Sequence, residues 1–203
     1  RKPRDRSSIG VPFSTPSFLL NKTTMSLFNS SYFGLQRRRQ GKSILDYDRY
    51  FFPLDAIANW NRLYGAKGFL QYQFVIPEDA ALEGITSVLD TIAGPGKGSF
   101  LTVLKKFGEQ NANLLSFPKA GYTLTLDFKN EPTLLPLLDE LDRIVLDHDG
   151  RLYLAKDARM SEDVFKASYP NWENFVAIKN EIDPNNRFAS LRAIRCSEQP
   201  CSA

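Results

Sequence analysis

A regular alternation of strand and helix patterns runs from residue 69 to residue 157 and constrains the fold more than any other feature. The string FLQYQFVIP, which begins at Phe69, alternates apolar and polar side chains with the period of a half-buried strand. Pro77 ends this strand and opens an amphipathic helix, which the run GPGKG stops. Two strands, SFLTVLKKF and GYTLTLDF, a second amphipathic helix from Pro132 and a last strand, RLYLAKD, follow. The predicted order is strand, helix, strand, strand, helix, strand.

This order is that of the ferredoxin-like split βαβ unit, an α+β fold with two helices on one face of an antiparallel sheet. The first and third strands of that unit are neighbours at the centre of the sheet. Their apolar sides must face the helices, which leaves four uncharged polar side chains on the opposite face. These are Gln71, Gln73, Thr123 and Thr125. A face of amides and hydroxyls suits a flat polar ligand or a partner domain, whereas a plain solvent-facing sheet is expected to carry more Lys and Glu.

Composition and charge narrow the classes of partner. The 203 residues suffice for one hydrophobic core with a small appendage, and a net charge of +3 indicates no particular partner. RNA-recognition domains share this element order but present aromatic side chains at the exposed strand positions, where this chain has Gln and Thr. Nucleic acid is therefore not expected as a partner. No apolar run is long enough to predict a transmembrane segment.

The chain shows no self-contained active site of a common type. It has no Gly-rich phosphate loop that opens a helix and no nucleophile elbow. Cys196 and Cys201 lie in a polar tail without a cluster of histidines, so no metal site is expected. His148 ends the second predicted helix, where it is expected to bind helix carbonyls and not to catalyse. If the chain is part of an enzyme, most of the cofactor site must lie elsewhere.

The segments that flank the regular unit are less patterned. Residues 1–45 are irregular, with a short helix predicted at 22–33, and residues 46–68 form an aromatic-rich loop. The basic run Arg37 to Arg39 suits a solvated loop, and contact with a phosphate or an anionic membrane surface stays open as the alternative. Residues 161–195 predict a helix, a break at proline and a second helix, before a tail at 196–203.

Several strings in a fixed order resemble the substrate domain of FAD-linked oxidases of the vanillyl-alcohol-oxidase architecture. They are NWNRLYGAKGFLQYQFVIP, SFLTVLKKFG, LSFPKAGYTLTLDF, GRLYLAKDAR, KASYPNWENF and DPNNRFAS. The resemblance runs from about Pro16 to about Arg195 and is strongest to the group that oxidises polyprenylphosphoryl ribose as the first half of a 2′-epimerase. It implies an FAD-binding domain upstream of residue 1. By this resemblance residues 1–45 are a linker from that domain, 46–68 a substrate-entrance loop, 69–160 the substrate domain, and 161–195 helices that pack back toward the FAD domain.

The resemblance also implies roles for individual residues near the flavin. Lys156 matches the catalytic lysine that lies against the flavin and the reacting carbon, where a cation stabilises the reduced ring. Tyr153 matches a flavin-contacting tyrosine, and Gln71 and Gln73 match glutamines of the substrate site. Because Tyr153 and Lys156 are three positions apart, a regular strand points them to opposite faces, so the strand must bulge or end between them.

Other matches fall on the substrate pocket and its entrance. Lys105 and Phe107 match pocket-lining residues, and Asp55 and Arg62 fall in the family's mobile entrance loop. Three pocket positions depart from well-known members, which have asparagine and cysteine where this chain has Thr123 and Thr125, and asparagine where it has Thr102. The fold assignment does not depend on these positions, but the identity of the substrate does.

The resemblance implies an FAD-dependent oxidoreductase that passes a hydride from a secondary hydroxyl of a sugar to FAD, with this chain as its substrate-binding part and inactive in isolation. A polyprenylphosphoryl pentose is the first candidate substrate, and an aldonolactone or alditol oxidase is the alternative. A stand-alone ferredoxin-like binding module is the alternative of another class. The expected partners are the sugar or lipid-linked sugar and the chain's own FAD domain, while a partner reductase and peripheral membrane contact stay open. The expected location is the cytoplasm or the surface of the inner membrane.

Overall fold

The computed structural model describes residues 9–12, 14, 22–38, 41–42, 44, 47, 51, 57–96, 99 and 101–188. The predictions for Arg39, Asp55, Cys196 and Cys201 lie outside these residues. The N-terminal part holds a parallel pair of two-residue strands, one long helix and a 3-10 helix. They are β1 (Ile9–Gly10), α1 (Lys22–Arg38), β2 (Ile57–Ala58) and η3 (Trp60–Tyr64).

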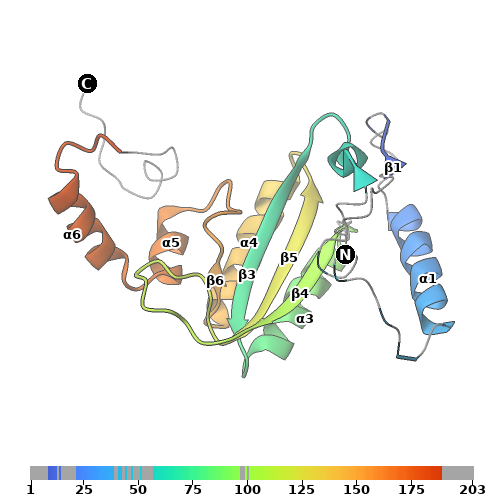
Figure 1. Cartoon of the computed structure of the whole chain (residues 1–203), viewed down its shortest axis with the longest axis horizontal. Coiled ribbons are helices and arrows are strands. Elements are labelled where there is room, and N and C mark those ends of the chain that lie inside the picture. Colours follow the sequence, from blue (N-terminus) through green and yellow to red (C-terminus); the bar gives the residue numbers. More distant parts are fainter. Residues whose placement is uncertain are drawn as a thin grey trace, which may run out of the picture.

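The centre of the molecule is a four-stranded antiparallel sheet with two helices (Figure 1). Its elements are β3 (Phe69–Pro77), α3 (Ala81–Ala93), β4 (Thr102–Phe107), β5 (Gly121–Lys129), α4 (Leu134–Asp147) and β6 (Arg151–Leu152). The strand order β4-β5-β3-β6 places the first and third strands of the unit side by side at the centre. The predicted ferredoxin-like topology is therefore confirmed.

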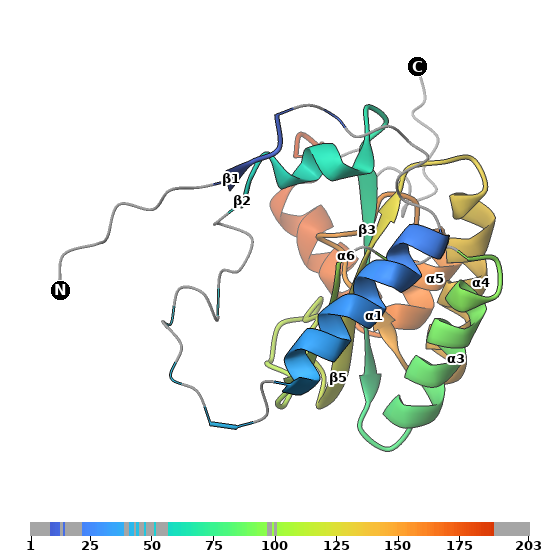
Figure 2. The same ribbon diagram turned by 90° about the vertical axis from the view of Figure 1, so that its right-hand side faces the viewer.

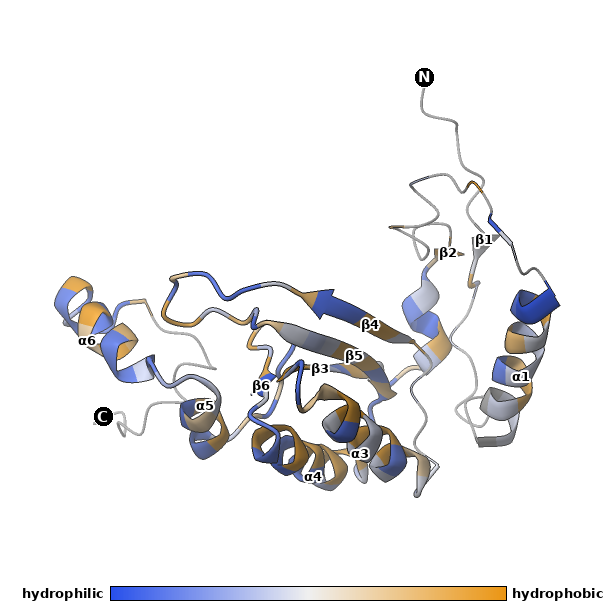
Figure 3. Cartoon of the chain, turned by 90° about the horizontal axis from the view of Figure 1, so that it is seen from below, coloured by the Kyte–Doolittle hydropathy of each residue, from blue (hydrophilic) through white to orange (hydrophobic). Residues whose placement is uncertain are grey.

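The hydrophobic core lies between the sheet and the helices α3 and α4. Seen along the sheet, both helices lie on one side of it and turn their apolar residues toward it (Figure 3). Phe74 and Ile76 of β3 are fully buried there, as are Val88 of α3 and Leu141 and Val145 of α4. Burial of each such side chain stabilises the fold by about 1.5–3 kcal/mol. The helices α3 and α4 leave the opposite face, which we call the front face, to η3 at one end, where the Tyr64 ring stacks on Phe69.

The connection from α4 to β6 is a tight turn at Asp149-Gly150. Asp149 adopts a left-handed conformation with φ of 53°, and the Gly150 N–H donates to the Val145 carbonyl at 2.8 Å. A Cβ atom at Gly150 would lie 2.5 Å from that same carbonyl oxygen, so only glycine fits. The His148 ring Nδ1 lies 2.7 Å from the Ile144 carbonyl, as expected for a histidine that binds the end of a helix.

Several boundaries differ from the predictions. Helix α1 continues five residues beyond the predicted end at residue 33 and includes Arg37 and Arg38, which the sequence placed in a loop. Helix α3 begins at Ala81 and not directly after Pro77. The last strand, predicted over RLYLAKD, is only the two residues of β6, because only these two pair with β3 in the sheet ladder.

The C-terminal part contains two short helices, α5 (Glu162–Ser168) and α6 (Trp172–Ile182), separated at Pro170 as predicted. The Ser161 hydroxyl accepts the Val164 N–H and caps α5. Helices α1 and α6 lie at opposite ends of the molecule, with the sheet between them (Figure 1), and Figure 2 shows the same arrangement from the side of α1. Within the described ranges, every helix is too short or too polar to cross a membrane.

Candidate functional site

The sheet register places the four predicted polar side chains on the front face. Gln73 is paired with Thr125, and Val75 with Thr123, while the alternate residues Tyr72 and Phe74 point into the core. Gln71, Gln73 and Thr125 are half-buried, so each has polar atoms within reach of a ligand.

Thr123 differs from the other three because it is completely buried, with 0% of its surface exposed. Its hydroxyl oxygen accepts a hydrogen bond of 3.1 Å from the Gln73 side-chain amide. The prediction that Thr123 faces an open polar surface is therefore wrong. In this structure Thr123 orients Gln73, and a ligand on the front face meets the Gln73 amide first.

The front face also carries a carboxyl group, whereas the sequence analysis predicted an uncharged stripe. Asp127 pairs with Gln71 in the register and is only 1% exposed. Burial raises the pKa of Asp127, while hydrogen bonding and the positive charge of Lys156 oppose the rise. The Tyr64 hydroxyl approaches Oδ2 at 3.4 Å, and burial next to this carboxyl raises the Tyr64 pKa as well. The period-two alternation that located Thr123 and Thr125 also places Asp127 on this face, so the sequence contained the signal.

Lys156 lies in a turn that begins where β6 ends. The Tyr153 N–H donates to the Gln73 carbonyl at 2.8 Å, which continues the sheet ladder for one residue. The chain then turns, because the N–H groups of Lys156 and Asp157 both donate to the Tyr153 carbonyl, at 3.0 and 3.2 Å. Tyr153 and Lys156 therefore reach the same side, as the sequence required if both contact the flavin.

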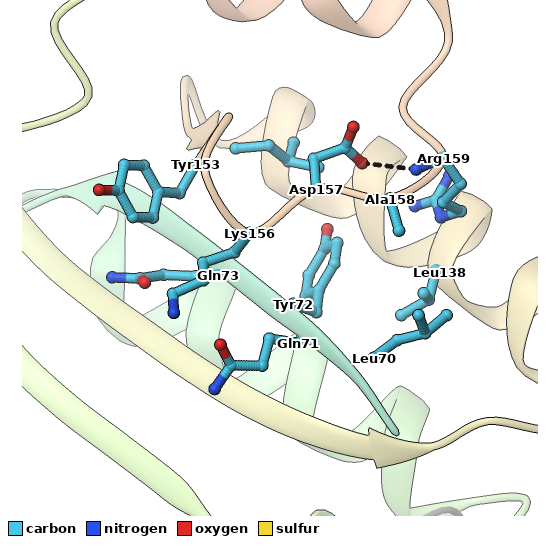
Figure 4. Close-up of a pocket in the computed structure, with 11 residues that line it drawn as sticks. Leu70, Gln71, Tyr72, Gln73, Leu138, Tyr153, Lys156, Asp157, Ala158 and Arg159 are labelled. Atoms are coloured by element: carbon cyan, nitrogen blue, oxygen red, sulfur yellow. Dashed lines mark hydrogen bonds between the residues drawn. The ribbon is translucent and has the colours of Figure 1, made fainter. Parts of the chain in front are cut away.

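A cavity at the edge of β3 brings most of the predicted flavin-side residues together (Figure 4). In that view the Lys156 side chain extends from the turn toward Gln73, and Gln71 lies farther along β3. The full lining is Leu70, Gln71, Tyr72, Gln73, Leu138, Leu152, Tyr153, Lys156, Asp157, Ala158 and Arg159. A cation and two amides beside a mostly apolar cavity can offer polar contacts to the edge of a flat ligand.

An aromatic group continues the front face away from this cavity. The rings of Tyr153 and Phe117 stack with centroids 4.3 Å apart, and Phe107 meets Phe117 edge-on at 5.7 Å. Phe117 is 7% exposed and supports Tyr153 from the loop between β4 and β5. The sequence analysis missed Phe117 because no periodic pattern covers that loop. Lys105 pairs with Thr123 in the register, so it shares the front face, but neither it nor Phe107 lines the cavity.

Arg151 holds the loop that carries Phe117. Its Nε donates to the Ser168 carbonyl at 2.8 Å, and its Nη1 donates to the Ser116 carbonyl and, at 3.2 Å, to Gln110. The guanidinium also lies 5.1 Å from the centre of the Tyr169 ring. Burial lowers the Arg151 pKa from its usual value. This buried cation fixes the loop against the last strand and α5, and the sequence alone gave no indication of it.

Of the two predicted entrance-loop residues, the structure describes Arg62, which does not line the cavity. Arg62 lies in η3, and its Nη1 donates to the carbonyls of Val11 at 3.1 Å and Pro12 at 2.8 Å. Its guanidinium thus binds the N-terminal segment beside β1. Asp55, the other residue predicted for the entrance loop, lies outside the described residues. Across the ranges that the structure describes, His, Cys, Asp and Glu side chains form no group suited to a metal ion.

Comparison with known proteins agrees with the resemblance seen in the sequence. A family profile described as D-arabinono-1,4-lactone oxidase matches residues 123–196. The decaprenylphosphoryl-beta-D-ribose oxidase of Mycolicibacterium smegmatis is 38% identical over 185 residues, which is 91% of this chain and 40% of that protein. This chain is a relative of the FAD-linked oxidases.

A second relative is an uncharacterized protein of Streptomyces coelicolor, named for its place in the mprA 5′ region. It is 36% identical over 105 residues, which is 51% of this chain and 29% of that protein. The chain thus spans less than half the length of either relative. The profile match begins at Thr123 and so includes β5 of the front face and the turn that carries Lys156.

Proposed function

We propose that this chain forms the substrate side of an FAD-dependent oxidoreductase that oxidises a secondary hydroxyl of a sugar. The observation that supports the proposal is the meeting of Lys156, Tyr153, Gln71 and Gln73 at one cavity at the edge of β3. Tyr153 and Lys156 reach this cavity because the strand ends after Leu152. A stand-alone binding module gives no reason for an ammonium group and two half-buried amides to line the same cavity.

The residues at the cavity fit an isoalloxazine ring. The ring offers carbonyl acceptors and one N–H donor along its pyrimidine edge, and the cavity offers the Lys156 ammonium and two amides that can donate or accept. Gln73 already donates to Thr123, so its carbonyl oxygen is the atom that remains to accept a hydrogen bond. FAD, when bound, supplies the oxidant that accepts a hydride from the carbinol carbon.

The residues of this chain then have separable tasks. Lys156 places a positive charge where electron density arrives, which favours electron transfer to the ring. Gln71 and Gln73 orient polar groups of the ligand, and Tyr153, stacked on Phe117, provides a rigid aromatic wall. Lys105 lies exposed on the same face of β4, where it can bind an anionic group of the substrate.

Two substrate classes have specific support. The name of the M. smegmatis relative supports a polyprenylphosphoryl pentose, and the exposed Lys105 together with Arg37 and Arg38 suits a phosphate. The profile match over residues 123–196 supports a soluble aldonolactone instead. We favour the lipid-linked pentose because that similarity extends over 91% of the chain.

The test of this proposal uses the intact flavoprotein and the bleaching of its visible absorbance under anaerobic conditions. A polyprenylphosphoryl pentose is expected to bleach it, and a free aldonolactone is not. Lys156→Met is expected to slow the bleaching about 100-fold or more, as loss of a key electrostatic group does in other enzymes. Lys106→Met is the matched control, because Lys106 pairs with Glu78 on the surface outside the cavity. Equal bleaching rates for Lys156→Met and wild type would refute the proposed role.

A further inference from the structure

The turn that carries Lys156 is held in place by a buried polar network on its far side. After Lys156, the Asp157 carboxylate accepts the N–H groups of Arg159 at 3.0 Å and Met160 at 2.8 Å (Figure 4). Met160 is 2% exposed and anchors the end of the turn in the core. These hydrogen bonds fix the backbone after Lys156, and the Arg159 side chain extends from the turn toward α4.

Arg159 reaches α4 and pairs with two carboxylates there. Its Nη2 lies 2.7 Å from Oδ1 of Asp142, and its Nη1 lies 2.5 Å from Oδ1 of Asp139. The side chains of Arg159 and Asp142 are 13% and 2% exposed, so this pair is almost entirely removed from water. Burial raises the Asp142 pKa, and the positive charge of Arg159 opposes that rise. The side chain of Asp139 is 59% exposed, so this second ion pair of Arg159 lies at the protein surface.

The same Asp142 oxygen connects the network to the central strand. The Tyr72 hydroxyl donates to Oδ1 of Asp142 at 2.9 Å, and Tyr72 is 4% exposed. Tyr72 lies on β3 between Gln71 and Gln73, the two amides of the cavity. One carboxylate oxygen thus ties the turn of Lys156 to the strand that carries both glutamines.

Stability alone does not explain such a network. A buried ion pair costs desolvation energy, and an apolar pair of similar volume often stabilises a protein as well or better. What the buried ion pair and the Tyr72 hydrogen bond provide, and apolar contacts do not, is a defined distance between α4, β3 and the turn. A displacement of about 1 Å at a catalytic group can slow a reaction about 100-fold.

We propose that Arg159, Asp142 and Tyr72 form a positioning network that sets the location of Lys156 relative to Gln71 and Gln73. None of the three contacts the reacting atoms in this role, and each acts through Lys156. The inference rests on the proposed function, in which Lys156 places its charge against the flavin.

The test measures the flavin midpoint potential of the intact flavoprotein, because a cation beside the ring favours the reduced form. Lys156→Met is expected to weaken that preference about tenfold, equivalent to about 30 mV for a two-electron couple. The double variant Asp142→Asn/Arg159→Met removes both buried charges together, so neither is left unpaired. The new asparagine still offers an amide oxygen that can accept the Tyr72 hydroxyl. This double variant is expected to reproduce roughly half or more of the shift in midpoint potential that Lys156→Met gives. The single variant Arg159→Lys keeps the positive charge and is expected to give a smaller shift than the double variant.

The decisive arm is the triple variant with Lys156→Met. If the network acts through Lys156, adding Asp142→Asn/Arg159→Met to Lys156→Met is expected to change the potential no further. Val145→Ala is the control for a purely structural effect, because it removes buried volume from the same helix and is expected to lower the melting temperature at an unchanged potential.

Two results would overturn the positioning network and leave the proposed function intact. The first is a wild-type midpoint potential in the double variant. The second is a triple variant whose potential differs from that of Lys156→Met by as much as the double variant differs from wild type. An unchanged potential in Lys156→Met itself would overturn the role of Lys156 in the proposed function, and the positioning role with it.

Discussion

At the scale of single residues, the buried carboxylate of Asp127 on the front face lowers the free energy of unfolding. The unfolded chain ionises Asp at a pKa near 3.8, whereas burial raises the Asp127 pKa in the folded state. As pH rises above 3.8 the unfolded state loses its proton first, so ionisation favours unfolding. Asp127→Asn is therefore expected to raise the free energy of unfolding at pH 7 by roughly 1 kcal/mol and to give no gain near pH 3.

Urea unfolding of the chain at the two pH values measures this difference. Asp90→Asn is the matched control, since Asp90 is exposed on α3 and is expected to give no pH-dependent gain. A gain of equal size at both pH values would show that the carboxyl is not the cause. If Asp127 instead takes part in the reaction, Asp127→Asn loses activity while it gains stability, which is the usual trade at functional sites.

The contrast between Gln73 and Thr123 shows what the sequence predicts at this scale. Period-two alternation places both side chains on the front face, and the register confirms that. It does not predict that Thr123 is completely buried, because burial depends on side chains that pack over it, such as Gln73, whose amide donates to its hydroxyl. A local pattern gives the face of a residue, whereas its exposure depends on segments distant in sequence.

At the scale of elements, the turn from α4 into β6 sets where the Lys156 segment enters the sheet. Gly150→Ala would bring a Cβ atom to 2.5 Å from the Val145 carbonyl oxygen and 2.9 Å from the Val75 carbonyl oxygen. Both contacts are to backbone, so β3 or α4 must move, and a loss of about 3 kcal/mol in unfolding free energy is expected. Gly108→Ala is the control, because nothing lies within 4 Å of its added Cβ. Similar melting temperatures for the two variants would contradict this account.

The same region shows why the length of β6 was not predictable. The string RLYLAKD has the composition of a strand, and its first two residues pair with β3. The ladder ends because the Tyr153 carbonyl accepts the N–H groups of Lys156 and Asp157, which turns the chain. The element order and the central strands follow from local periodicity, but the end of this strand is set by a backbone turn that the composition of the string does not reveal.

At the scale of the whole molecule, apolar side chains are exposed on both end helices. On α1, Leu27, Phe28, Tyr32, Phe33 and Leu35 are each more than half exposed, and α6 exposes Phe175, Ile178 and Ile182. Patches of this kind usually mark surfaces that contact another domain or partner. The packing of residues 161–195 against an FAD domain stays a prediction, and the exposed side chains of α6 are the surface on which we expect that contact.

This arrangement predicts how the chain behaves by itself with the cofactor. The front face can contact only one side and one edge of the flavin ring, and the sequence lacks a Gly-rich cradle for the pyrophosphate, which supplies much of the affinity in dinucleotide sites. The 203-residue chain mixed with FAD is therefore expected to emerge from gel filtration without visible absorbance, while the intact protein keeps its colour. Circular dichroism of the same fraction establishes that the chain is folded. Retention of one FAD per chain would mean that the described residues and their flanking segments hold the cofactor themselves, and the division of the site between two domains would then be wrong.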